Sequence, residues 1–189
     1  PGAPERCDDV DHDCDGTARE VVATHIDPSG LVTDLTATLG AGTASAPVHH
    51  AAEPGDLQFC GGTWFVTLLA SSGNYYGYDG AVLDAAGSGS VVRVPEGTNL
   101  DVYDLVLQGG SGHLNEGATV GGAVLVEEGV EYFRLARSVI RDSTADYGGG
   151  IDVLPRNPGC CLLDGVTVQG NTATYNGGGI TVGAGSRLN

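Results

Sequence analysis

A Gly-rich motif recurs three times in the last third of this 189-residue chain. It stands at Gly121-Gly122-Ala123-Val124, at Gly148-Gly149-Gly150-Ile151 and at Gly177-Gly178-Gly179-Ile180, with steps of 27 and 29 residues. A fixed period of this size is typical of stacked structural repeats, in which no single unit buries its own apolar face. The spacing therefore constrains the architecture before any functional residue is considered.

Short segments of alternating hydrophobicity align with the motif. Four sets of segments match between repeats: 92–94 with 124–126, 151–153 and 180–182; 100–102 with 133–135 and 161–163; 105–107 with 138–140 and 166–168; and 142–145 with 170–173. In the first set, alternation places the Val and Ile residues on one face, and Arg93, Leu125, Asp152 and Thr181 on a face predicted to meet water. Helical periodicity is absent, and 32 glycines suit tight corners better than helices. The sequence predicts an all-β parallel β-solenoid.

Ladders of like polar residues are a second consequence of such stacking. Ser143 and Asn171 occupy matching positions, and side chains stacked between coils would hydrogen-bond about 4.8 Å apart. Ordinary turn chemistry accounts for the same residues equally well.

Residues 59–189 resemble a known superfamily. The segments 59–66, 82–87 and 90–94 resemble the first coils of the right-handed parallel β-helix (pectin-lyase-like) superfamily, in the branch found in large secreted or surface proteins of bacteria. The Asn-Thr-Ala and Gly-Gly-Gly-Ile pattern at 171–173 and 177–180 is similar to the repeats of chlamydial polymorphic outer-membrane proteins. The resemblance implies a right-handed β-helix, but it is weakly specific for function, because one fold hosts many chemistries.

Three regions follow from these patterns. Residues 1–20 form an acidic, cysteine-containing segment, residues 21–58 an N-terminal cap that covers the first edge, and residues 59–189 the β-helix coils, which we expect to be truncated at the C-terminus. The alternation over 32–39 predicts a strand within the cap, and His49 and His50 are expected in a solvated loop. An uncapped last coil would favour end-to-end self-association.

The acidic segment carries a candidate cation site. Asp9, Asp11, Asp13 and Asp15 are closely spaced, and Gly16 follows directly. Alternate carboxylates before a glycine resemble the start of an EF-hand loop, although its twelfth position is Val22 and Glu20 would have to close the cage. The hypothesis is a calcium site; a solvated acidic tail is the alternative.

The same segment resembles a short metal-binding motif of secreted bacterial proteins in which two cysteines flank the acidic run. That resemblance implies a small disulfide loop between Cys7 and Cys14. Cys60, Cys160 and Cys161 are then candidates for a further disulfide, the outward one of the adjacent pair bonding to Cys60. A zinc site from these three cysteines with His49 and His50 is an alternative, but it lacks the usual ligand spacing.

Charge and cysteine content indicate which partners the chain can bind and where it is located. The formal net charge is −16, from 24 acidic and 8 basic residues, and all the basic residues are arginine. Such a balance repels nucleic acid and anionic lipid and favours divalent cations. Five cysteines in a β-rich chain indicate an oxidising compartment. We therefore expect a secreted or cell-surface location, with no nucleic-acid partner and no apolar run long enough for membrane insertion in this segment.

Two functional hypotheses follow. The first is a non-catalytic structural or adhesive solenoid, stabilised by calcium, whose partners are polysaccharides or other surface proteins; Tyr75, Tyr76 and Tyr78 could supply a stacking surface. The alternative is a polysaccharide lyase or glycoside hydrolase of the pectin-lyase-like superfamily, which needs converging acids and a base. Candidates for those groups are Arg93, Asp101, Asp104, Glu127, Glu128, Arg134, Arg137, Arg141, Asp142, Asp146 and Asp152. His113 lies in a loop insert and has no partner that the sequence identifies. No signature of the catalytic families joins them, so the sequence predicts no catalytic residue.

Overall fold

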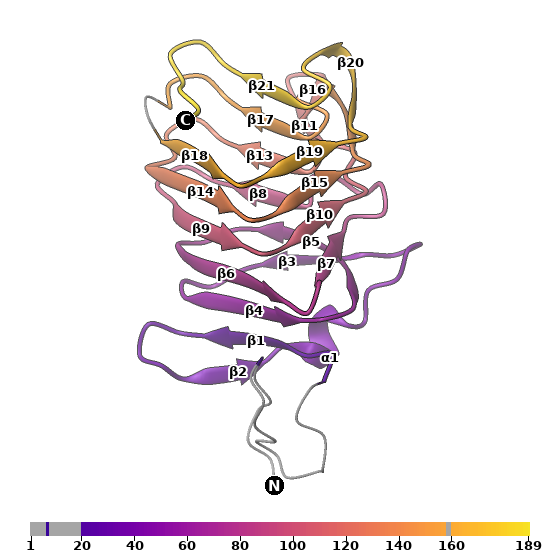
Figure 1. The fold of residues 1–189 in the computed structure, drawn as a ribbon, viewed down its shortest axis with the longest axis vertical. Helices are drawn as coiled ribbons and strands as arrows, with labels where there is room; N and C mark the ends of the chain where they lie inside the picture. The colour runs from indigo at the N-terminus through magenta and orange to yellow at the C-terminus, as the bar shows by residue number, and fades with distance from the viewer. Residues whose placement is uncertain (1–6, 8–19, 158–159) are drawn as a thin grey trace, which may run out of the picture.

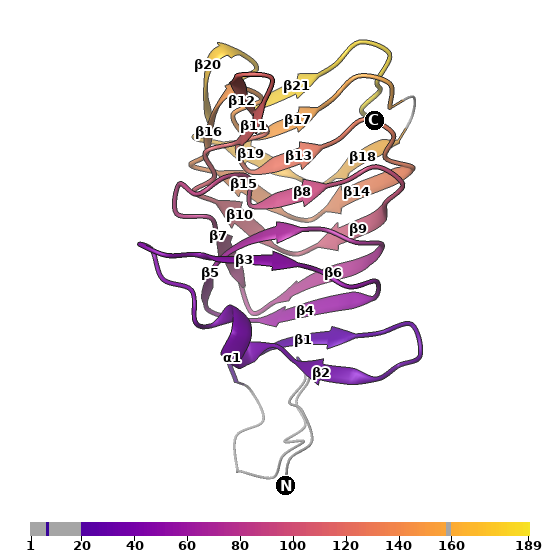
Figure 2. The same ribbon diagram turned by 180° about the vertical axis from the view of Figure 1, so that it is seen from behind.

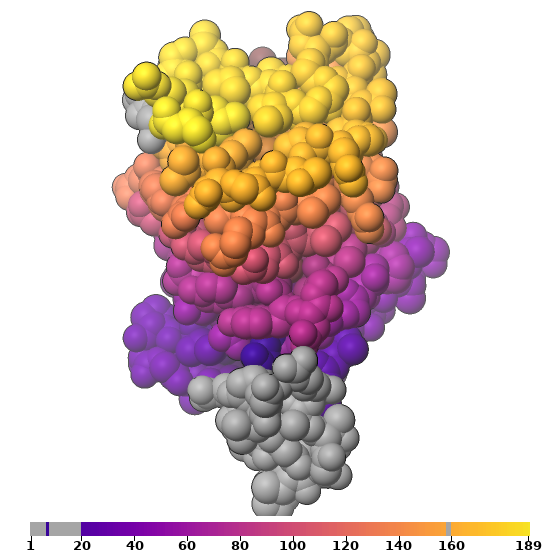
Figure 3. Space-filling model, viewed as in Figure 1, coloured from indigo at the N-terminus to yellow at the C-terminus, as the bar shows by residue number. Residues whose placement is uncertain are grey.

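A computed structural model describes Cys7, residues 20–157 and residues 160–189. Its strands are arranged in successive windings of the chain, which lie one above another from the N-terminal to the C-terminal end (Figures 1 and 2). The space-filling view shows the same order as bands of colour along the long axis (Figure 3). The described residues thus form an all-β stack of mostly parallel strands, an arrangement compatible with a β-solenoid.

A seven-stranded sheet forms one side of the stack. Its order is β18 (Cys161–Asp164), β14 (Tyr132–Ala136), β9 (Asn99–Tyr103), β6 (Gly73–Tyr78), β4 (Asp56–Cys60), β1 (Ala23–Ile26) and β2 (Val32–Asp34). Every neighbouring pair from β18 to β4 is parallel, whereas β1 pairs antiparallel with both β4 and β2. The change of direction at β1 ends the parallel stack at this edge.

A ten-stranded curled sheet forms two further sides. Its order is β19 (Thr167–Gln169), β15 (Val139–Arg141), β10 (Val106–Gln108), β7 (Val82–Asp84), β5 (Thr63–Leu69), β8 (Val92–Val94), β13 (Val124–Val126), β17 (Ile151–Val153) and β21 (Ile180–Val182), with β3 (Val48–Ala51) paired to β5. The long strand β5 joins the two sides, because its first residues pair with β7 and its last with β3 and β8.

A four-stranded sheet lies at one corner of the upper windings. Its order is β11 (His113–Asn115), β12 (Ala118–Val120), β16 (Thr144–Tyr147) and β20 (Thr172–Asn176). The β11–β12 pair is an antiparallel hairpin, and β12 joins β16 in parallel. The described part of the chain also contains one short helix, α1 (Thr36–Leu39). The predicted strand over 32–39 is therefore wrong beyond Asp34: β2 ends there, and Leu39 is buried by the helical turn.

The predicted registers are confirmed. Val92 pairs with Val124, which pairs with Ile151, which pairs with Ile180. The other aligned sets match at Leu100–Phe133–Cys161, at Val106–Val139–Thr167 and at Thr144–Thr172. Because the windings pair in register, each inward position continues as a column of apolar side chains through the core.

The Gly-rich motifs stack directly on one another, which explains why they repeat. Gly122, Gly149 and Gly178 form one column, in which the Gly122 N–H donates to the Gly148 oxygen and the Gly149 N–H to the Gly177 oxygen. A Cβ at Gly149 would lie 2.2 Å from the Thr172 oxygen and 2.5 Å from the Gly178 oxygen. Close backbone approach therefore requires glycine at this position.

Two disulfides are present among the described residues, and they correct the predicted pairing. Cys7 bonds to Cys60 and Cys160 bonds to Cys161. The Cys7–Cys14 bridge is thus wrong, as are a bond from Cys60 to the adjacent pair and the zinc site, because these thiols are already oxidised. The Cys7–Cys60 bond spans 53 residues and ties the N-terminal segment to β4, a contact that local spacing cannot reveal.

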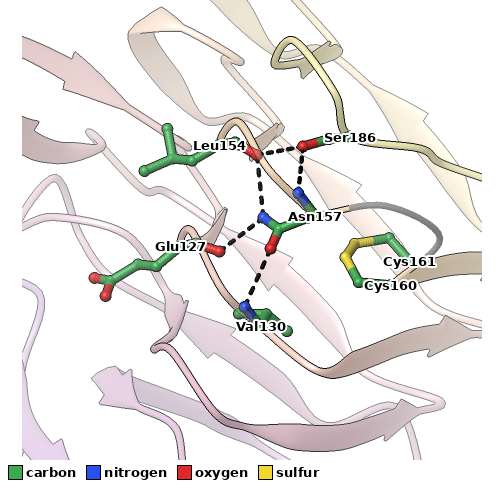
Figure 4. Close-up of a disulfide and its surroundings, with 7 residues drawn as sticks. All are labelled: Glu127, Val130, Leu154, Asn157, Cys160, Cys161 and Ser186. Carbon is green, nitrogen blue, oxygen red and sulfur yellow. Dashed lines mark hydrogen bonds between the residues drawn. A yellow bond between two sulfur atoms is a disulfide. The ribbon is translucent and has the colours of Figure 1, made fainter.

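A buried asparagine beside the second disulfide connects three windings (Figure 4). The Asn157 side chain is fully buried; it accepts from the Val130 N–H and donates to the Glu127 and Leu154 oxygens. The Asn157 N–H donates to Ser186 Oγ on the next winding at 3.0 Å. The corner thus satisfies backbone groups that burial would otherwise leave without partners.

The glycine column makes a prediction about stability. Gly149→Ala should lower the free energy of unfolding by about 3 kcal/mol or more, because the new methyl group meets backbone oxygens that cannot rotate away. Gly178→Ala is the matched control, since its Cβ would lie at an ordinary 3.4 Å from the Asn171 oxygen. Chemical denaturation measures both variants, and equal losses would contradict the stacking explanation.

Candidate functional site

Two adjoining pockets lie on the outer side of the sheet that contains β3, β5, β8 and β13. This side of the sheet faces the viewer in Figure 2. The first, here called the histidine pocket, has a volume of about 400 Å³. It is lined by His49, His50, Ala51, Thr67, Leu68, Leu69, Ser88, Gly89, Ser90, Arg93 and His113. These residues come from β3, β5, β8, β11 and the loop after β7.

The second, here called the glutamate pocket, continues along the stack and has a volume of about 410 Å³. It is lined by Arg93, Glu96, His113, Asn115, Leu125, Glu127, Glu128 and Leu154. Arg93 and His113 line both pockets, so the two form one groove with a histidine-rich end and a glutamate-rich end.

The hairpin β11–β12 supplies one wall of the groove and is held in place by hydrogen bonds of Thr119 and Ser111. Thr119 donates its N–H to the Asp146 carboxylate at 2.9 Å, and Thr119 Oγ1 accepts from the Asp146 N–H. Ser111, at the base of the hairpin, donates to the Gly87 oxygen and accepts from the Gly89 N–H. These bonds fix His113 against the sheet.

An ion pair lies where the two pockets meet. Arg93 on β8 donates from Nε to the Glu127 carboxylate, which follows β13 on the next winding. Burial and the nearby Arg93 lower the pKa of His113, whereas Glu127 opposes that shift. Burial and the nearby His25 lower the pKa of His50. Both histidines are therefore neutral at pH 7, and His49 Nδ1 shares a 2.5 Å hydrogen bond with Thr67 Oγ1.

Most of the predicted acid and base candidates are paired between windings. Ion pairs between neighbouring windings in the described part of the chain include Arg93–Glu127, Arg134–Asp164, Arg137–Asp104 and Arg156–Glu128. Arg141 donates to Gln108 on the winding below and lies near Asp142 on its own. Asp101 accepts from the Tyr103 hydroxyl. Among the described residues outside the groove, no candidate acid, base and nucleophile lie together at one site.

The tyrosines expected to form a stacking surface are divided between the core and the surface. Tyr75 is fully buried, its hydroxyl accepts from the Ser71 N–H, and burial raises its pKa to about 12. Tyr76 stacks on Tyr103 of the next winding at 5.3 Å between ring centroids. The guanidinium groups of Arg134 and Arg137 lie over the Tyr103 ring. The ring faces thus contact neighbouring windings.

The prediction that the second face of these strands is polar and exposed to water is partly wrong. Leu125 and Asp152 are 1% and 3% exposed, because the Gly-rich corners at Gly121 and Gly148 fold over them. In the strand register Asp152 lies between Leu125 and Thr181, neither of which carries a charge. Burial raises the pKa of Asp152 to about 6.

The predicted calcium ligands Asp9, Asp11, Asp13 and Asp15 lie outside the described residues, and of that set only Glu20 lies within them. Within residues 20–157 and 160–189 and at Cys7, no group of three or more His, Cys, Asp or Glu side chains could hold a metal ion. The same residues contain no helix long and apolar enough to cross a membrane.

No family model, curated protein or solved structure matches the chain. The site must therefore be interpreted from its own geometry.

The groove was not predicted from the sequence, although one signal pointed to it. Val92 and Val124 are separated by 32 residues, whereas the next steps between aligned strands are 27 and 29. The extra residues hold the hairpin that carries His113. His49 and His50 lie in strand β3 rather than in a loop, because Val48–Ala51 adds to the edge of β5. That pairing joins segments with no repeat in common, so periodicity cannot reveal it.

Asp152 predicts a specific dependence of stability on pH. Its pKa is higher in the folded state, so its contribution to stability is full below about pH 4, the ordinary pKa of Asp, and is lost as pH rises through about 6. Asp152→Asn should therefore raise the free energy of unfolding at neutral pH by about 1–3 kcal/mol and change it little near pH 4. Urea denaturation across this range, with the variant compared to wild type at each pH, measures the difference; parallel curves would contradict the assignment.

Proposed function

We propose that the chain is part of a right-handed parallel β-helix of pectin-lyase-like architecture that serves as a non-catalytic structural or adhesive element of a secreted or cell-surface protein. Its stacked windings and disulfides support this proposal, since the former suit a rigid rod and the latter an oxidising compartment. Polysaccharides and other surface proteins are the partners that fit such an element, and end-to-end association is a further proposal.

The observation that carries the non-catalytic assignment is how the charged side chains are used. Four arginines form ion pairs with carboxylates on a neighbouring winding, and these pairs include Asp104, Glu127 and Glu128. A carboxylate whose oxygens are held by an arginine is engaged in that pair and is poorly placed to donate a proton to a substrate. Exposed pairs each contribute only about 0.2–1 kcal/mol, but a set of them fixes the order and register of the windings.

A polysaccharide lyase or glycoside hydrolase is the second candidate, and one feature of the groove favours it. Glu127 and His113 lie close enough to interact electrostatically, and both line the glutamate pocket with Glu96 and Glu128. Carboxylates along an open groove are the groups that glycosidic bond cleavage uses. In this arrangement His113, neutral at pH 7, would be the base.

A turnover assay separates the two functions. The intact chain is incubated with a panel of neutral and acidic polysaccharides, and new reducing ends and unsaturated products are measured. We expect retention of a polysaccharide without cleavage, since Glu127 and Glu128 in the groove are held by arginines. Cleavage that Glu127→Gln or His113→Gln abolishes, while Arg141→Gln on another side leaves it intact, would establish the enzyme instead.

Calcium binding by Asp9, Asp11, Asp13, Asp15 and Glu20 is proposed from their spacing alone. Carboxylate oxygens are the ligands that this hard cation prefers. The Cys7–Cys60 bond would couple a folded acidic segment to β4, so that binding there would stabilise the stack.

A calcium titration of thermal stability tests this assignment. A ligand that binds only the folded chain adds about 2.7 kcal/mol at 100 times its Kd, which raises the Tm by roughly 5–10 °C for a domain of this size. Asp13→Asn should reduce that shift, and magnesium serves as the ion control. A melting temperature that neither calcium nor chelator changes would contradict the proposal.

A further inference from the structure

We propose that the histidine pocket binds an oxyanion, namely a carboxylate, sulfate or phosphate group of a ligand. This inference is independent of the proposed function, because a structural element and an enzyme could each carry such a site.

The lining of the pocket differs sharply from the rest of the chain. Acidic residues outnumber basic ones 24 to 8 in the sequence, yet none of the described Asp and Glu residues lines this pocket. Two histidines, His49 and His113, face it together with Arg93. His50 also borders it, but its side chain turns to the opposite face of β3, in register with the buried Leu68. Ser88 and Thr67 add hydroxyl groups, of which that of Thr67 is shared with His49, whereas the buried Ser90 hydroxyl already donates to the Gly121 oxygen. Glu127 competes for Arg93 from the adjoining pocket, and the donors that it leaves are the groups that an oxyanion requires.

Arg93 has donors left for such a ligand. Its Nε–H is used by Glu127, and the described residues show no side-chain partner for its two terminal nitrogens. Because the Arg93 side chain lines both pockets, those terminal groups can reach the groove. A guanidinium that uses only its Nε–H in one ion pair still offers the N–H groups of its terminal nitrogens, in the same plane, to a second oxyanion.

The histidines make the site responsive to pH. His113 faces Arg93 and Glu127, His50 faces His25 and Glu53, and His49 bonds to Thr67. Burial keeps His113 neutral at pH 7, and an anion in the pocket would favour its protonated form. Affinity for the oxyanion should therefore rise as pH falls through the range in which histidine titrates.

The net charge of −16 works against the approach of any anion, so binding has to be local. At physiological ionic strength, charges separated by more than about 8 Å are largely screened. The lining residues then dominate the interaction, and the site should be detectable at this ionic strength although the whole chain is acidic.

The test is a titration of the intact chain with sodium sulfate and, separately, with sodium acetate at constant ionic strength. NMR signals of the histidine ring protons report binding, at about pH 5.5 and about pH 7.5, on either side of the ordinary histidine pKa. We expect saturable shifts at His49 and His113 that are stronger at the lower pH. Preference for sulfate identifies a tetrahedral ester group as the ligand, and preference for acetate a carboxylate.

Two substitutions at one ion pair should act in opposite directions. Arg93→Gln should weaken binding about tenfold or more, since it removes a charge-assisted donor. Glu127→Gln should tighten binding, because it releases the Arg93 Nε–H and removes a nearby negative charge. His113→Gln should weaken binding chiefly at the lower pH, and Arg141→Gln, on another side of the stack, should change nothing.

Several outcomes overturn the proposal. The first is the absence of saturable shifts at either pH. The second is binding that Arg93→Gln leaves intact. The third is a loss on Glu127→Gln as large as that on Arg93→Gln, which would mean that the ion pair acts only by holding the fold. Melting curves of each variant, measured in parallel, establish that the compared chains are folded.

Discussion

Backbone hydrogen bonding between successive windings, in parallel and in register, is the constraint on which the rest of this structure depends. It places Val92, Val124, Ile151 and Ile180 over one another and so forms a continuous apolar column. The same register brings the second glycines of the corner motifs within van der Waals range of the next backbone. Any shift by one residue would turn the apolar side chains outward, so the repeats specify the fold strongly.

The register also determines what the outer surface can do. Side chains on adjacent windings lie about 4.8 Å apart, close enough for arginine and carboxylate to pair. Arg137 and Asp104 pair in this way, as do Arg93 and Glu127. Charges that a sequence offers as catalytic candidates are thus used mainly to hold neighbouring windings in order. The groove differs from this pattern, because the hairpin β11–β12 interrupts the regular winding and places His113 beside the sheet.

The sequence predicted the repeated parts of the fold well and the unrepeated parts poorly. Registers such as Val106–Val139–Thr167 follow from internal repetition, since each winding supplies the template for the next. The Cys7–Cys60 bond and the pairing of β3 with β5 join segments that share no sequence pattern. The spacing of residues along the chain therefore could not predict these contacts. Alternation predicts that Asp152 faces water, whereas the folded corner covers it. The histidine pocket combines an unrepeated strand with an inserted hairpin and was missed for the same reason.

Interstrand nuclear Overhauser effects on isotope-labelled protein test the central claim most directly. The account predicts contacts between the backbone protons of Val124 and Ile151 and between those of Ile151 and Ile180, in the pattern of parallel in-register strands. Strong Hα–Hα contacts typical of antiparallel pairing, or no contact between these segments, would contradict it.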